Sequence, residues 1–113
     1  MKDLISFFDF EKIDIGGGTI ISAEINNQLS KPSIILKIDF GKDIGIKKSS
    51  AQIIKNYIID KLIHKQVAAI INFPPKQIGN LISEVLVLGF PDDENEPILI
   101  SSDKKVSNGV KLY

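Results

Sequence analysis

The feature that most constrains the fold is a strict two-residue alternation of apolar side chains between positions 34 and 40. Ile34, Leu36, Ile38 and Phe40 take every second position, and Lys37 and Asp39 lie among the residues between them. Successive side chains of a strand point to opposite faces, so this spacing predicts a strand with one buried face and one mostly polar face. Gly41 is expected to end it.

Other segments predict further short strands. Alternation recurs over 67–73 until Pro74 and Pro75, which cannot donate to a sheet ladder. β-branched residues predict a strand over 19–25, entered from Gly16–Gly18 through a bulge or sharp bend, and segments 84–90 and 98–100 add more. Many short strands separated by turn residues favour a small barrel over a βαβ sheet. We expect a mainly β protein with an OB-fold, a five-stranded Greek-key barrel.

Two helical segments interrupt this pattern. Apolar residues at helical spacing behind Asp3, a candidate N-cap, predict a short amphipathic helix at the N-terminus. A second helix is expected somewhere between residues 51 and 65, where apolar side chains again recur at helical intervals.

Composition narrows the class of protein. A chain of 113 residues suits one domain, residues 1–113. No apolar run approaches the roughly 20 residues needed to cross a bilayer, and the N-terminus lacks the features of a signal peptide, so no membrane insertion is expected. The absence of cysteine excludes disulfides and thiolate metal sites and suits a reducing compartment, so we expect a cytoplasmic protein.

Motifs for catalysis, metals and cofactors are missing. Gly16–Gly18 do not belong to a nucleotide-binding motif and are interpreted as a backbone feature using the freedom of glycine at positive φ. His64 has no serine or carboxylate at a catalytic spacing. Pro97 stands where a calcium loop after Asp92 would need glycine, so that acidic segment predicts a solvated hairpin turn. The chain is therefore expected to be a binding module without catalytic residues, metal or cofactor.

Charge is segregated along the chain although the formal net charge is zero. Six lysines lie between residues 47 and 76, where Asp60 is the only acid, and acids cluster over 92–96. Every basic residue is lysine, which provides a point charge but no planar fork for bidentate recognition. The middle stretch is a candidate ligand face, although lysines often only solvate a surface and Pro74–Pro75 equally fits a stiff turn.

Four stretches closely resemble the CsaA proteins, and the likeness covers nearly the whole chain. They are Asp9–Ile15, Gly45–Ile53, Asn72–Phe90 and Ser107–Leu112. The resemblance implies a tRNA-binding OB-fold domain related to the end domain of some methionyl-tRNA synthetases. It also implies a homodimer and a chaperone linked to protein export.

The resemblance also implies site residues. The loop that faces tRNA in those relatives carries over to Asn72, Lys76, Gln77 and Ser83, with Lys47, Lys48 and Ser50 as further candidates. Two positions where the family commonly has arginine carry other residues here. Gly16 follows Asp14-Ile15, and Lys76 follows the paired prolines. Loss of the planar fork predicts weaker and less specific RNA binding.

Two functions remain open. A nucleotide-independent chaperone would bind unfolded or export-destined polypeptides on an exposed apolar surface or a strand edge, whereas a tRNA-binding accessory protein would act with translation or aminoacylation. The apolar residues near the proline loop could form such a peptide surface or belong to the core. A homodimer would bury apolar residues at both ends of the chain. The peptide candidates are Phe73, Pro74, Pro75, Ile78 and Phe90, and the candidates for dimer burial are Leu4, Phe7, Phe8, Val110, Leu112 and Tyr113.

Overall fold

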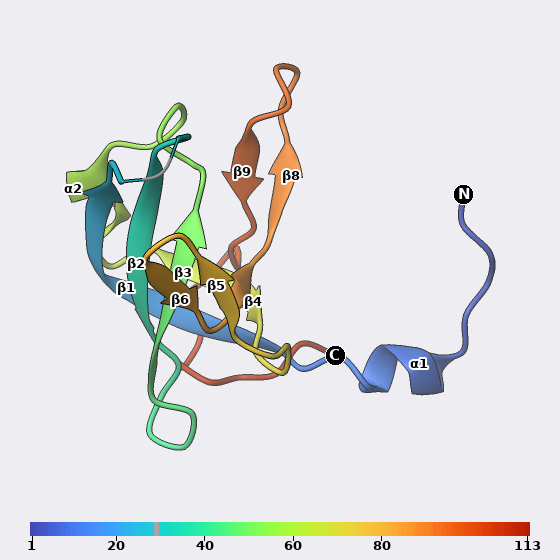
Figure 1. Cartoon of the computed structure of the whole chain (residues 1–113). Coiled ribbons are helices and arrows are strands. Elements are labelled where there is room, and N and C mark those ends of the chain that lie inside the picture. Colours follow the sequence, from blue (N-terminus) through green and yellow to red (C-terminus); the bar gives the residue numbers. More distant parts are fainter. Residues whose placement is uncertain (29) are drawn as a thin grey trace.

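The computed structural model describes residues 1–28 and 30–113. Its main element is a five-stranded antiparallel sheet of order β3-β2-β1-β4-β7, which curls into a half-barrel (Figure 1). Two small hairpins and two short helices accompany it, which confirms the expected mainly β, OB-type fold. The bounds are α1 Phe7–Glu11, β1 Ile15–Asn26, β2 Ser33–Asp39, β3 Ile46–Ala51, α2 Ile59–Leu62, β4 Gln66–Ile70, β5 Lys76–Ile78, β6 Leu81–Ser83, β7 Leu86–Val87, β8 Gly89–Pro91 and β9 Pro97–Leu99.

The alternation over 34–40 forms the centre of the core. Ile34, Leu36 and Ile38 are fully buried, Phe40 is 1% exposed, and Lys37 lies on the outer face. The first half of β1 pairs with β4 and its second half with β2, and its register shifts between Ile20 and Ser22. That irregularity lets one long strand serve both neighbours, since a bulge bends a strand and increases its twist.

Gly16–Gly18 lie inside β1 rather than before it, and none of the three has a positive φ. The expected left-handed backbone is therefore wrong, and close approach of the neighbours explains the glycines instead. A Cβ on Gly18 would come within 2.7 Å of both Ile38 and Phe40, and one on Gly16 would collide with Ile71. The predicted irregularity exists, but it lies between Ile20 and Ser22, after the glycines instead of at them.

Helix α1 begins after Ser6 instead of Asp3. The Ser6 hydroxyl accepts the Asp9 N–H, and the Asp9 carboxylate accepts the Ser6 N–H. This reciprocal capping box satisfies two donors that a helix start would otherwise leave free. Helix α1 lies apart from the barrel (Figure 1), and Phe7 and Phe8 are 68% and 67% exposed.

The remaining predicted elements differ from the structure in their bounds, and β3, β5 and β6 were not predicted. Helix α2 is a single turn that buries Leu62, and the expected range for it overlaps β3, which ends at Ala51. Strand β4 ends at Ile70, so Phe73 lies beyond it, and the segment predicted over 84–90 divides into β7 and β8. No helix among the residues that the structure describes has the length and apolar composition needed to cross a membrane.

The acidic segment forms the turn of the β8–β9 hairpin, as predicted. The Asp92 carboxylate accepts the backbone N–H groups of Glu96 and Glu94 and the side-chain amide of Asn56. The Glu96 bond, followed by the Asn56 bond, favours the charged form and lowers the pKa of Asp92. The Asp92 carboxylate therefore has a structural role in the turn.

Candidate binding groove

A groove of about 500 Å³ brings together two segments that are far apart in the sequence. One is the end of β3 at Ser50, and the other is the proline loop with the β5–β6 hairpin and the residues that follow it. Predicted tRNA and peptide positions meet in this one groove. The residues that line it are Ser50, Phe73, Pro74, Lys76, Ile78, Ser83, Glu84, Val85 and Leu86.

Hydroxyl groups fasten the hairpin to the barrel beneath this groove. The Ser83 hydroxyl accepts the Ser50 N–H at 3.1 Å and donates to the Val85 carbonyl at 3.3 Å. The Ser50 hydroxyl donates to Ser33 Oγ at 3.1 Å. Both predicted contact serines are thus engaged within the protein, so they position the groove walls.

The proline loop supplies one wall. Pro74 and Pro75 connect the end of β4 to β5, and the fixed φ of proline restricts the path of the chain there. Phe73 is 49% exposed and lines the groove with Pro74. Pro75 instead lines an adjoining depression together with Lys48. The loop is therefore both a stiff connection and part of a concave surface.

Asn72 lies beside the groove but its side chain is occupied. Its amide nitrogen donates to the Lys12 carbonyl at 2.8 Å, and its amide oxygen accepts the Asp14 N–H at 2.9 Å. These bonds fasten the segment between α1 and β1 to the end of β4. Asn72 therefore positions the segment that leads from α1 into β1.

Replacing Asn72 by Ala is expected to lower the free energy of unfolding by about 1 kcal/mol, because both bonds lie in exposed positions. Cleavage of the α1 segment in limited proteolysis should accelerate. Asn27→Ala, at an exposed loop asparagine, is the matched control. Equal cleavage rates for both variants and the unchanged protein would refute the role of Asn72 as an anchor.

The lysines form a path that leads to the groove. Lys48 on β3 lies directly opposite Lys37 on β2, and both are exposed on the outer face of the sheet. Lys76 lies opposite Ser83 in the β5–β6 hairpin. Like charges directly opposite each other destabilise a sheet. Lys37 was missed from sequence, although its outward position in the alternation was the available signal.

Three other candidates have different surroundings. The Lys47 ammonium lies 4.0 Å from the Glu84 carboxylate, so part of its charge is balanced internally. The Gln77 amide donates to the Gly79 carbonyl and fixes the β5–β6 turn. Phe90 is 69% exposed on β8, opposite Ile98, and does not line the groove.

Comparison with known proteins places this chain in a class of binding domain. The family described as "Putative tRNA binding domain" matches residues 12–111. The chaperone CsaA from Bacillus anthracis is similar in structure, with 40% identity, a TM-score of 0.92 and coverage of 98% of this chain and all of the other. The CsaA chaperone from Picrophilus torridus has 46% identity, a TM-score of 0.89 and coverage of 97% and 100%.

The chain therefore belongs to the putative tRNA-binding domain family and, within it, to the CsaA proteins. The methionine–tRNA ligase of Methanococcoides burtonii is 34% identical over 112 residues, which cover 99% of this chain but 16% of the ligase. The matches thus describe a binding domain and chaperones, and the similarity to ligases extends over only a small share of those enzymes.

Proposed function

We propose that this protein is a nucleotide-independent chaperone of the CsaA type, a single domain over residues 1–113 that binds unfolded or export-destined polypeptides in the cytoplasm. The observation that carries the proposal is the apolar lining of the groove beside a short edge strand. Membership in a family that includes two CsaA chaperones supports it. The proposed function involves no catalytic step and needs no cofactor.

The groove suits an extended polypeptide. Phe73, Ile78 and Leu86 provide apolar walls, and Lys76 and Glu84 provide charges of both signs. Strand β5 pairs only with β6 among the described residues, so its other edge offers unpaired backbone groups. A peptide that adds to such an edge gains main-chain hydrogen bonds while pockets receive its alternate side chains.

Phe73→Ser tests this site. The variant is expected to bind a labelled unfolded polypeptide about tenfold more weakly, because an exposed aromatic side chain at a concave surface is a typical anchor. Fluorescence anisotropy measures the affinity, and suppression of client aggregation provides a second readout. Ile58→Ser, at a 63% exposed residue outside the groove, is the control, and equal binding by both variants would refute the site.

A second function, tRNA binding in support of translation or aminoacylation, is favoured by a separate observation. Lys37 and Lys48 are held opposite each other at a cost to the sheet, and an RNA backbone would neutralise both. Lys76 would extend the contact to the proline loop. Because these contacts release counterions, the affinity should fall steeply with salt, whereas apolar peptide binding should not.

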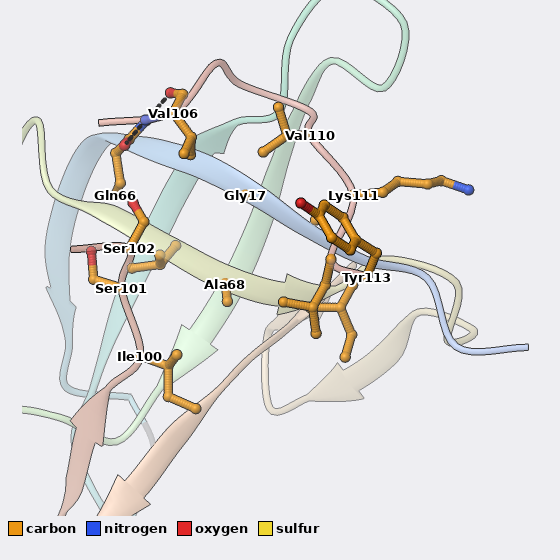
Figure 2. A pocket seen from close by; sticks show the side chains of 14 residues that line it. Gly17, Gln66, Ala68, Ile100, Ser101, Ser102, Val106, Val110, Lys111 and Tyr113 are labelled. Atoms are coloured by element: carbon orange, nitrogen blue, oxygen red, sulfur yellow. Dashed lines mark hydrogen bonds between the residues drawn. The ribbon is translucent and has the colours of Figure 1, made fainter. Parts of the chain in front are cut away.

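A homodimer is the proposed state of assembly. Leu4, Ile5, Phe7 and Phe8 are each at least 67% exposed, and the C-terminus lies next to α1 (Figure 1). Figure 2 shows an apolar groove that Ala68, Ile100 and Val110 line, with Tyr113 at its mouth. A partner that covered these surfaces would remove a large apolar area from water.

The double variant Phe7→Ser/Phe8→Ser should shift the mass from two chains to one at micromolar concentration, because the exposed face of α1 would no longer be apolar. Light scattering coupled to size exclusion measures this mass. Phe90→Ser removes an equally exposed phenylalanine elsewhere and should leave the dimer intact. A monomeric mass for the unchanged protein would contradict the proposal.

A further inference from the structure

Another groove, called the second groove to distinguish it from that at the proline loop, lies between the barrel and the segment that follows β9. It adjoins the apolar groove of Figure 2, with which it shares Gln66, Ser101, Ser102 and Val106. It is polar and encloses about 650 Å³. Thr19, His64 and Gln66 form its barrel side, and residues 101–108 form the other side. It shares no lining residue with the groove at the proline loop. It is therefore a separate surface that the proposed peptide and tRNA contacts do not use.

Hydrogen bonds from the barrel fasten the segment that forms the other side of this groove. The Gln66 amide donates to the Val106 carbonyl at 2.7 Å and accepts the Val106 N–H at 2.9 Å (Figure 2). The Thr19 hydroxyl donates to the Asn108 side-chain oxygen at 2.6 Å. Segment 101–108 has no helix and almost no strand, yet it is fastened at two points. A ligand would meet a preformed surface, which reduces the entropic cost of binding.

The charges on this surface are mostly positive. Lys104 and Lys105 are exposed, and across residues 1–28 and 30–113 neither ammonium forms an ion pair. Asp103 is the only carboxylate in the lining. Two neighbouring lysines without acidic partners repel each other, and an anionic ligand would relieve that repulsion.

His64 adds an unusual backbone conformation. Its φ is +75°, and its N–H donates to the Ile20 carbonyl at 2.8 Å. A residue with a Cβ is destabilised by about 1–2 kcal/mol at such a φ, whereas glycine adopts it without this cost. His64 lines the groove across from the lysine-bearing segment, where its imidazole N–H can donate to a ligand.

We propose that this second groove binds the phosphate backbone of RNA through Lys104, Lys105 and His64. The inference rests on the RNA-binding half of the proposed function and adds a contact surface that is separate from the proline loop. The groove is polar and open to solvent, which fits a strand of phosphates and does not fit an enclosed apolar small molecule. Lysine contacts of this kind give affinity without sequence preference.

The test compares Lys104→Ala/Lys105→Ala with Lys2→Ala/Lys31→Ala, a control that removes two exposed lysines outside both grooves. The dissociation constant for labelled tRNA is measured by anisotropy over a salt series. Loss of two phosphate contacts should reduce the slope of log K against log salt by about 1.5 and weaken binding on the order of 30-fold at 0.1 M salt. Matching thermal unfolding curves will show that both variants fold.

The possible results separate this inference from the function on which it rests. If the unchanged protein binds tRNA and both double variants keep the same slope, the second groove is not an RNA contact, and the proposed tRNA function stands. If the unchanged protein binds no tRNA, both are overturned. Amide NMR shifts at residues 101–108 when tRNA is added, beside any shifts near Lys37, Lys48 and Lys76, would support the groove independently of any substitution, and the absence of shifts at 101–108 would refute it.

Discussion

The variant Gly18→Ala is expected to unfold with a free energy lower by about 1–3 kcal/mol, the typical cost of an extra methyl group in a filled core. The new Cβ would lie 2.7 Å from Ile38 Cγ2 and 2.7 Å from Phe40 Cδ1. Both neighbours are buried at 1% exposure or less, so neither can move aside freely. The sheet must open slightly or a side chain must leave its preferred rotamer.

Gly17→Ala provides the matched control in the same strand. Its new Cβ would lie 3.3 Å from Val110 Cγ2 on the opposite face, where a small adjustment suffices. Chemical denaturation of both variants measures the difference. Because both substitutions reduce the freedom of the unfolded chain equally, equal stability would show that the core tolerates a methyl group at position 18 and that the close approach explains nothing.

The triple variant Lys37→Ala/Lys48→Ala/Lys76→Ala should weaken tRNA binding on the order of 100-fold at 0.1 M salt. Each lost phosphate contact reduces the slope of log K against log salt by about 0.7–0.9, so three contacts reduce it by about 2–3. The same variant should keep its affinity for an unfolded polypeptide within about threefold, since the apolar walls of the groove are unchanged. Its stability should rise slightly because Lys37 and Lys48 no longer repel each other.

A control must remove the same charge elsewhere. Lys2→Ala/Lys31→Ala/Lys42→Ala also removes three positive charges at exposed positions that line neither groove. If the control loses as much tRNA affinity as the test variant, general charge rather than the lysine path explains binding. Equal loss of tRNA and polypeptide binding in the test variant would instead point to one shared surface.

Local patterns were sufficient for much of the fold. The alternation over 34–40 predicted β2 with its buried Ile34, Leu36 and Ile38, and the buried Phe40 directly after it, since a strand with one buried face leaves a period of two in the sequence. Helix α1 was expected, but Ser6 caps it because a serine three residues before Asp9 completes a capping box. The glycine run was misread because a need for close approach leaves no local pattern that separates it from a need for positive φ.

Only part of the candidate groove could be predicted from the sequence. The resemblance to CsaA proteins indicated the proline loop, and its residues do line the groove. Which hydroxyl and amide groups face a ligand could not be inferred. Asn72 and Ser83 bond to backbone groups that are distant in sequence, and Gln77 bonds to the Gly79 carbonyl in the β5–β6 turn. Lys37 became visible only when the β2–β3 register placed it opposite Lys48.

The sequence by itself determined the presence of β1, β2, β4 and the β8–β9 turn and the absence of any known catalytic motif, because these depend on residues a few positions apart. Strands β3, β5 and β6 became apparent only in the structure. Tertiary structure alone decided why Gly18 has no side chain, which lysines lie together and how segment 101–108 is fastened by Gln66. Each of these depends on contacts between residues tens of positions apart, and such contacts arise only when the sheet register brings those segments together.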